Sequence, residues 1–296
     1  MNIVQRQYRL LSDYEKVNKF LRNMYNTETY NSYLLQPFFE HAHHSYKFNH
    51  KLAHRFGIWE ENNELIGFTC FEMNLGECFI ILKAEHDHIL IEIINYAEKN
   101  LSEEKNGKRA LTIWLNDKET KKKRLLEQMG YKITHSDPIT IFSYEREFPN
   151  RKLPDGFKII SLEEENDLQK INDCLWYGFD NGPNPYPNND AIDRRMQMQS
   201  DLNFRKDLTT VIKAPNGEYA CYAGMRIEED NKYAYLEPLA TVPKYRRMGL
   251  STIALGEGIR KTKNLGMKYC FGGCMDFYYS IGFEKVGYIE FWKKEW

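Results

Sequence analysis

The chain has 296 residues, of which 42% are hydrophobic and 28% are charged, and its 41 basic side chains almost balance its 42 acidic ones. This composition is typical of a globular protein, and the length suits two domains of ordinary size. The balanced charge gives no overall field that would draw the protein onto nucleic acid or an anionic membrane. Residues 1–11 lack the apolar run of a signal peptide, and no later segment has the ~18 continuous apolar residues of a membrane span. We therefore expect a cytoplasmic protein with no nucleic-acid or membrane partner.

The first half of the chain alternates between strand and helix patterns. Short apolar runs with strand spacing and longer runs with helical spacing follow one another in order. They predict a strand, two helices, three strands, a long helix and a strand at residues 8–11, 13–25, 32–42, 54–59, 65–73, 77–82, 87–100 and 111–115. The half closes on a short helix that ends in Gly130-Tyr131 and on a final strand pair.

The second half repeats this order after a shift of about 150 residues. Its elements are predicted at residues 157–160, 168–179, 190–202, 209–213, 219–227, 233–241, 249–265 and 269–272, followed by a short helix that ends in Gly282-Phe283. Antiparallel strands followed by a strand-helix-strand crossover favour α+β domains with mixed, mostly antiparallel sheets flanked by helices. We predict two tandem domains, at 1–148 and 157–296, joined by the polar, proline-containing linker 149–156.

An irregular stretch, residues 180–189, separates the first two helix patterns of the second half. Its three prolines exclude regular structure, so it is either a plain surface loop or a loop that borders a substrate groove. Polar and aromatic side chains nearby could line the same groove or form a charged face and core aromatics; they are Trp176, Tyr177, Asp193, Arg194 and Arg195.

The turn Arg246-Arg247-Met248-Gly249-Leu250-Ser251 carries the clearest chemical signal in the chain. It lies between a predicted strand and a predicted helix, where free backbone N–H groups at a helix N-terminus favour an anion. Gly249 permits close approach and a positive φ, and Arg246 and Arg247 add charge. The alternative is a solvated turn ahead of a surface helix.

This turn, with the strand before it, resembles the cofactor motif of the GNAT family, the GCN5-related N-acetyltransferases. Residues 239–251 match the family pattern of a hydrophobic strand, a proline and Arg/Gln-x-x-Gly-x-Gly/Ala, except that Ser251 replaces the small final residue. A second family mark follows at Phe277-Tyr278-Tyr279-Ser280-Ile281-Gly282-Phe283. Two motifs in the right order are more specific than one. The resemblance extends over residues 157–296.

The resemblance implies that acetyl-CoA binds along the edge of the strand that ends at Thr241. Backbone groups of Leu239, Ala240 and Thr241 would hold pantetheine as if it were an added strand, and residues 246–251 would hold the pyrophosphate. Tyr278 matches the tyrosine that protonates the departing CoA thiolate. Glu237 matches an acidic base that some members carry, with ordered water as the alternative.

The first half resembles a GNAT domain that has lost its cofactor site. Glu85-His86-Asp87-His88-Ile89-Leu90 occupies the place of the basic turn, without a glycine and with carboxylates that repel a pyrophosphate. Leu126 stands at the position of Tyr278. We therefore predict two acyltransferase-like folds and one cofactor site.

Metal binding has two weak candidates in the sequence. His41 and His44 share a helix face, and Cys270 and Cys274 are separated by three residues. Buried thiols and solvated or core histidines explain both groups without a metal, so we predict none.

The expected activity is transfer of an acetyl group from acetyl-CoA to a primary amine, by direct attack in a ternary complex. A small molecule is the expected acceptor because the irregular loop and the extra half would crowd the groove. A non-catalytic acyl-CoA sensor or interaction module is the alternative, and a longer acyl donor or another class of amine also stays open. We expect a monomer or a homodimer.

Overall fold

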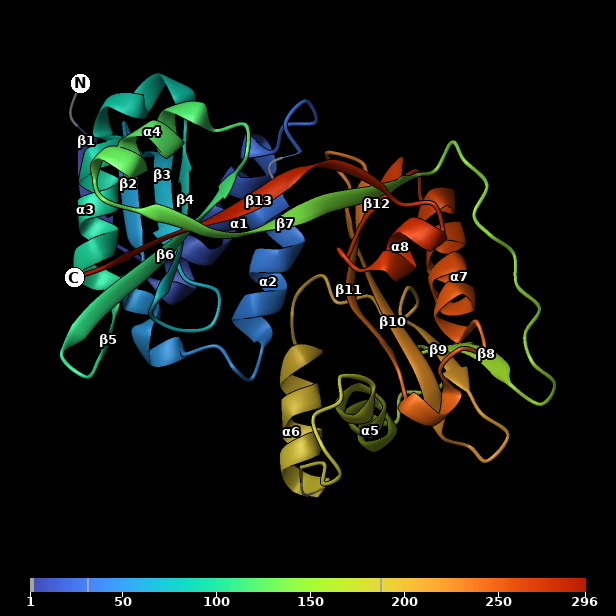
Figure 1. The fold of residues 1–296 in the computed structure, drawn as a ribbon. Coiled ribbons are helices and arrows are strands. Elements are labelled where there is room, and N and C mark those ends of the chain that lie inside the picture. Colours follow the sequence, from blue (N-terminus) through green and yellow to red (C-terminus); the bar gives the residue numbers. More distant parts are fainter. Residues whose placement is uncertain (1–2, 31, 187) are drawn as a thin grey trace. The chain divides into compact units, whose positions relative to one another are not determined.

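The computed structural model describes residues 3–30, 32–186 and 188–296, which form the helices and strands shown in Figure 1. By their contacts the residues divide into two compact units. The first consists of Met1–Ile139 and Val286–Trp296, and the second of Thr140–Lys285.

The first unit is built on a mixed sheet in the order β1-β2-β3-β4-β6-β13. Only β4 and β6 of this series are parallel, because the helix α3 connects them by a crossover. The elements in chain order are β1 (Ile3–Gln7), α1 (Leu10–Met24), η1 (Ser32–Leu34), α2 (Gln36–His44), η2 (His50–Arg55), β2 (Gly57–Glu61), β3 (Glu64–Cys70), β4 (Glu77–Leu82), η3 (Ala84–Ile89), α3 (Leu90–Asn100), β5 (Glu103–Lys105), β6 (Lys108–Asn116), α4 (Thr120–Gln128) and β7 (Lys132–Ser143).

The second unit has the sheet order β7-β12-β11-β10-β9-β8, in which β11 and β12 are the parallel pair. The helices α5 and α7 pack on this sheet and belong to two separate hydrophobic clusters. Its elements after β7 are β8 (Lys158–Ser161), α5 (Leu168–Gly178), α6 (Asn188–Met198), β9 (Thr210–Lys213), β10 (Tyr219–Glu228), β11 (Tyr233–Thr241), η4 (Pro243–Tyr245), α7 (Leu250–Asn264), β12 (Tyr269–Gly272) and α8 (Asp276–Ser280). The chain then continues into β13 (Glu284–Glu295).

The predicted fold class is confirmed: both units are α+β, with mixed and mostly antiparallel sheets. Local detail differs from the prediction. The strand predicted at 8–11 is wrong: β1 ends at Gln7 and α1 begins at Leu10. A 3₁₀ helix, η2, occupies the first part of the strand predicted at 54–59, and η3 occupies the first residues of the helix predicted at 87–100. Each half ends in one strand of 12 residues, β7 or β13, and not in a strand pair.

The last strand of the chain belongs mainly to the first unit. Residues Ile289 to Glu295 of β13 pair antiparallel with β6, and Thr134 Oγ1 of β7 donates to the carbonyl of Phe291 at 3.1 Å. The contact units therefore have other limits than the linear division at 149–156. That division stays a prediction about which segments fold independently.

Residues 144–157 pack on the second unit. The Tyr144 hydroxyl lies 2.7 Å from Thr262 Oγ1 of α7, and the Phe148 ring lies so close to Gly256 that a Cβ there would be 3.0 Å away. Leu153 contacts the same hydrophobic cluster. The residues just before the predicted linker therefore pack on α7, and Leu153 of the linker packs on the core of the second unit.

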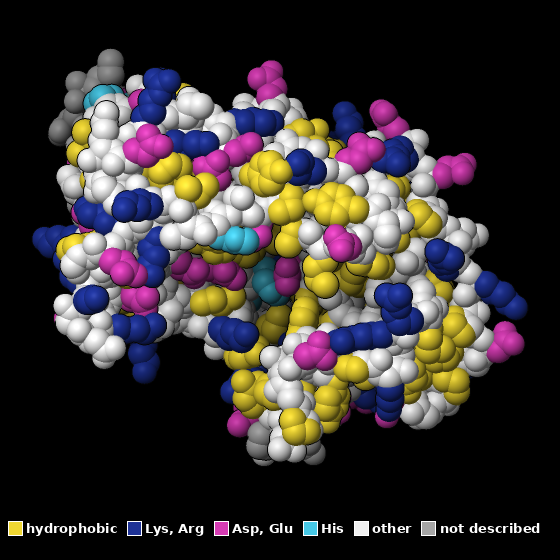
Figure 2. All heavy atoms as spheres, in the orientation of Figure 1, with side chains coloured by type: hydrophobic (Ala, Val, Ile, Leu, Met, Phe, Trp, Pro, Cys, Tyr) yellow, Lys and Arg dark blue, Asp and Glu magenta, His cyan; other side chains and the backbone are white. Residues whose placement is uncertain are grey.

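Charges are mixed over the face of the molecule shown in Figure 2, where basic and acidic side chains alternate. This distribution agrees with the near-zero net charge of the sequence. Among the described residues, no helix combines the length and the hydrophobicity needed to cross a membrane.

Candidate functional site

The strands β11 and β12 separate after a short parallel contact. They pair over three residues, from Tyr233 with Tyr269 to Tyr235 with Phe271. β12 ends at Gly272, whereas β11 continues to Thr241. The part of β11 beyond Tyr235 therefore has an edge that β12 does not cover (Figure 1).

The direction of the backbone groups on this edge follows from the pairing with β10. The N–H of Val242 donates to the carbonyl of Ala220 at 3.0 Å. Since such bonds alternate along an antiparallel pair, Ala240 also bonds to β10, while Leu239 and Thr241 point their N–H and C=O groups away from it. Leu239 and Thr241 thus face the uncovered edge, and Ala240 does not.

A β-bulge shapes the middle of the same strand. The register of β10 and β11 shifts between Ala223 and Met225, opposite Glu237 and Pro238, which are joined by a cis peptide bond. Only a glycine fits opposite the bulge, because a Cβ on Gly224 would lie 2.5 Å from the carbonyl oxygen of Glu237. A bulge re-aims the side chains beside it.

The predicted anion-binding turn lies at the end of β11. Arg247 and Gly249 have positive φ values of 65° and 79°, and Gly249 is the N-cap of α7. The first helical hydrogen bond runs from Ile253 N–H to the Gly249 carbonyl, so the earlier N–H groups of α7 have no acceptor within the helix. Ser251 Oγ lies 2.7 Å from Thr241 Oγ1, which fixes the helix start against the strand.

Of the other turn residues, Leu250 is buried in the core and Met248 is exposed. Arg246 has partners within the protein: its guanidinium donates to the carbonyls of Thr241 and Gly178 at 3.1 and 3.0 Å and pairs with Asp180 at 2.9 Å. Arg246 therefore ties the end of α5 to the end of β11. An anion at the turn would compete with Asp180 for this guanidinium.

Tyr278 lies on α8, and its ring packs against the backbone of Gly272 and Gly273. A Cβ on Gly273 would lie 2.5 Å from Tyr278 Cε2 and 3.2 Å from its hydroxyl, and one on Gly272 would lie 3.0 Å from Tyr278 Cδ1. The ring also packs edge-on against Phe283, with centroids 5.3 Å apart. Burial, and then the charge of Glu237, raise the pKa of the Tyr278 phenol, so it stays protonated at neutral pH.

Glu237 lies at the bulge with its side chain partly buried. Burial raises the pKa of this carboxyl to about 7, and the Arg226 guanidinium opposes that shift. Because the Glu237 charge also acts on Tyr278, the structure brings both predicted catalytic side chains to one region, beside the uncovered edge of β11. The pair combines a group able to accept a proton near neutral pH with one able to donate a proton.

The sequence interpretation overlooked the glycines that position these groups, Gly224, Gly272 and Gly273, and the buried ion pair between Arg226 and Asp201. The doublet Gly272-Gly273, immediately before the Phe-Tyr motif, was a visible signal for a close approach of backbone and ring. Nothing in the sequence marks the ion pair, because its members are 25 residues apart.

Comparison with known proteins decides the family of this site. Residues 174–288 match the acetyltransferase (GNAT) family. They form an acetyltransferase domain of the GNAT family. No curated protein sequence is similar enough to count as a relative of the chain.

Solved structures resemble the whole chain. A GCN5-related N-acetyltransferase from Sphaerobacter thermophilus has a TM-score of 0.64 and 11% identity, over 99% of this chain and 95% of that one. A tandem GNAT protein from the clavulanic acid biosynthesis pathway has a TM-score of 0.64 and 10% identity, over 99% and 98%. A GNAT acetyltransferase from Colwellia psychrerythraea has a TM-score of 0.59 and 15% identity, over 99% and 100%. These likenesses confirm the predicted tandem GNAT fold.

Beside the GNAT site, α5 and α6 hold the irregular loop. Trp176 Nε1 donates to the Gly182 carbonyl at 2.9 Å and its ring meets that of Tyr186, with centroids 4.7 Å apart. The Arg194 guanidinium lies 3.3 Å from the Tyr186 ring centroid. Arg195 is buried and its guanidinium lies 3.4 Å from the side chain of Asn172. The described part of the loop is therefore anchored on both helices, and Arg195 does not belong to a solvated face.

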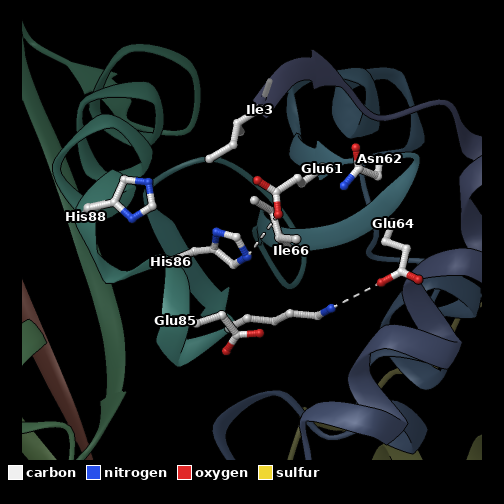
Figure 3. A pocket seen from close by; sticks show the side chains of 9 residues that line it. Ile3, Glu61, Asn62, Glu64, Ile66, Glu85, His86 and His88 are labelled. Atoms are coloured by element: carbon white, nitrogen blue, oxygen red, sulfur yellow. Dashed lines mark ion pairs between the residues drawn. The ribbon is translucent and has the colours of Figure 1, made fainter. Parts of the chain in front are cut away.

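In the first GNAT-like unit, the place of the basic turn is acidic. Glu85, His86 and His88 of η3 line a cavity of about 640 Å³ together with Glu61 and other residues (Figure 3). His86 Nε2 lies 3.8 Å from Glu61 Oε2. These carboxylates disfavour a pyrophosphate at this position. Leu126, the counterpart of Tyr278, is buried in the core.

The two metal candidates of the sequence are not assembled in the structure. Cys270 is buried whereas Cys274 is exposed. Within residues 3–30, 32–186 and 188–296, no group of three or more His, Cys, Asp or Glu side chains is placed to hold a metal ion.

Proposed function

We propose that this chain is an N-acetyltransferase that moves an acetyl group from acetyl-CoA to a primary amine of a small molecule, by direct attack in a ternary complex. The observation that carries the proposal is that the charge of Glu237, on β11, raises the pKa of the Tyr278 phenol, on α8, so both groups lie in one region beside the part of β11 that β12 does not cover. Membership of residues 174–288 in the GNAT family supports acyl transfer in general. The choice of acetyl donor and small amine is our inference from the site.

The residues of the second unit fit acetyl-CoA. Leu239 offers an outward-facing N–H and C=O that an extended pantetheine can bond to, as an added strand would. The N-terminus of α7 offers free N–H groups to a pyrophosphate, and Gly249 leaves the approach open, with only Arg151 Cγ near its Cβ position. When bound, acetyl-CoA supplies the thioester that is the acyl donor.

The chain's own residues would handle the protons. Glu237 takes one proton from the ammonium form of the acceptor, which a carboxylate with a pKa of about 7 can do near neutral pH, and the freed lone pair of the nitrogen then bonds to the acyl carbon. Tyr278 donates its hydroxyl proton to the sulfur as the C–S bond breaks, and the products are the amide and CoA. The nitrogen loses its second proton to water as the amide forms, Glu237 releases the first proton to water, and Tyr278 regains a proton from water.

Acetyl-CoA turnover tests the proposal. Purified protein is incubated with acetyl-CoA and a panel of amines that includes polyamines, aminoglycosides, amino sugars and a lysine peptide, and free CoA is measured through its thiol. We expect release that depends on one class of small amine. Calorimetry with CoA runs in parallel, so that binding without turnover identifies a non-catalytic sensor and absence of binding overturns the cofactor site itself.

Replacing Gly249 with alanine is expected to weaken acetyl-CoA binding by about tenfold. An alanine is strained at a φ of 79°, by roughly 1–2 kcal/mol, and relief of this strain turns the N–H groups at the start of α7. Calorimetric titration with acetyl-CoA measures the loss. Gly266, at the other end of α7 with a φ of 86° and nothing near its Cβ position, gives the matched control. Equal losses for Gly249→Ala and Gly266→Ala would contradict a role of the turn in binding.

A further inference from the structure

Arg226 of β10 and Asp201, from the segment after α6, form a buried ion pair. Arg226 Nη2 lies 2.5 Å from Asp201 Oδ2, and the two side chains are only 5% and 0% exposed. The guanidinium also lies 5.9 Å from the ring of Phe204 in the same segment. The pair therefore fixes the segment between α6 and β9 to the central strand of the second unit.

This ion pair lies on the Glu237 side of the sheet. Arg226 pairs with Tyr235 across the β10–β11 ladder, so the two side chains leave the sheet on one face. Side chains alternate along a strand, and Glu237 is two residues after Tyr235, at the first position of the bulge, where the ladder is regular up to Leu236. The effect of the Arg226 charge on the Glu237 carboxyl agrees with a shared face. Arg226 and Glu237 therefore project from neighbouring strands to the same face.

A charged group of β10 and a titratable group of α8 interact with Glu237. From β10, the Arg226 guanidinium lowers the pKa of the Glu237 carboxyl against the larger effect of burial. From α8, the Tyr278 phenol responds to the Glu237 charge, which raises its pKa. Asp201 acts through the guanidinium that it holds. Arg226 is thus the basic group that opposes protonation of this carboxylate.

A purely structural role explains the ion pair poorly. Within the described residues, Asp201 Oδ1 is buried with no hydrogen-bond partner. Buried ion pairs that are not fully hydrogen-bonded seldom stabilise a fold more than apolar residues of the same volume. Their electrostatic effect on a neighbour inside the protein is large, because water screens it weakly.

We infer that Arg226 is a positioning residue for the transfer reaction: held by Asp201, its guanidinium keeps Glu237 ionised and thereby able to take the proton of the acceptor amine. This inference rests on the proposed function. It also gives the segment after α6 an influence on the base, because Asp201 places the guanidinium. Neither Arg226 nor Asp201 has to touch a substrate for this effect.

The test replaces both partners with apolar residues, Arg226→Met with Asp201→Leu, so that neither charge is left buried alone. We expect the acid limb of the pH profile of kcat/KM to move up by about one pH unit, which lowers the rate about tenfold on that limb and leaves the plateau at high pH unchanged. Arg226→Lys keeps the positive charge and should keep the limb close to that of the wild type. Thermal melts confirm that each variant is folded.

A titration of the carboxyl itself does not depend on activity. The protein is labelled with ¹³C at the glutamate carboxyl carbons, and the Glu237 signal is identified by its absence in Glu237→Gln. The midpoint of the pH titration of this signal should rise in the double variant. The matched control is Arg205→Met with Asp207→Leu, an ion pair at 2.6 Å in the same unit that does not act on Glu237. This control should leave the midpoint and the acid limb in place.

Each outcome separates the two proposals. An unchanged Glu237 midpoint in the folded double variant overturns the role of Arg226, whatever the activity. If the wild type releases no CoA with any amine, while the midpoint of the Glu237 titration still rises in the double variant, the proposed function is overturned. The electrostatic effect of Arg226 on Glu237 is then still supported. If the double variant does not fold, Asp201→Asn replaces it: the less compensated guanidinium should lower the midpoint, and a rise would contradict the inference.

Discussion

The Tyr278→Phe variant is expected to lose about 10²- to 10³-fold in kcat for CoA release while its affinity for acetyl-CoA stays within about threefold. The phenol is the proton donor to the departing thiolate, and burial keeps it protonated at the pH of the assay. A phenylalanine ring fits against Gly272 and Gly273 in the same way, so the packing is preserved. Steady-state thiol release and calorimetry with acetyl-CoA measure the two quantities separately.

The neighbouring tyrosine provides the control. Tyr279 follows Tyr278 on α8 and its side chain is exposed, so Tyr279→Phe should leave kcat unchanged. If kcat falls by less than threefold in Tyr278→Phe, another group, such as water, delivers the proton to the thiolate. A fall in acetyl-CoA affinity with unchanged kcat would instead mean that the hydroxyl only helps binding.

The Glu237→Gln variant is expected to lose about 10²-fold in kcat/KM at pH 8 and to lose the acid limb of the pH profile. The wild-type rate should rise through pH about 7, the value to which burial raises the pKa of this carboxyl, since only the ionised form accepts the amine proton. Glu229 lies exposed in the turn between β10 and β11, and Glu229→Gln should keep both the rate and the limb. If water relays the proton instead, kcat/KM of Glu237→Gln will fall by less than tenfold.

The same substitution should change the pH dependence of stability. A carboxyl whose pKa is higher in the folded than in the unfolded protein favours folding below its unfolded pKa and loses that contribution as the pH rises through the folded pKa. Between pH 4.5 and 7, Glu237→Gln should therefore become progressively more stable than the wild type, by roughly 3 kcal/mol at most. Urea unfolding at pH 5 and pH 8 measures the free energy of unfolding of both proteins. An equal difference between Glu237→Gln and the wild type at both pH values would contradict an ionised, partly buried Glu237.

The order of elements and the site of the chemistry were accessible from the sequence because both depend on local signals. Apolar periodicity located most of the helices and strands, and Gly249 with the Phe-Tyr motif located the turn and Tyr278. These features need only residues that are close together in the chain. The bulge opposite Gly224 needed the register of two strands, which no single segment contains.

Arg246 shows how long-range contacts change the meaning of a motif. The sequence predicts that the Arg246 side chain binds a phosphate, whereas in the structure its guanidinium already bonds to Asp180 and to two backbone carbonyls. Asp180 belongs to the irregular loop, 66 residues before Arg246. The pairing depends on how α5 packs on β11, and the local sequence carries no sign of it.

The strand β13 has a consequence for how the protein is made. Its residues from Ile289 to Glu295 pair with β6, so β6 lacks this sheet neighbour until those residues have been synthesised. N-terminal domains commonly fold during synthesis, before the C-terminal segments have been made. Here the sheet of the first unit is completed only after residues 289–295 have been translated, and residues 140–285 of the second unit have been made by then.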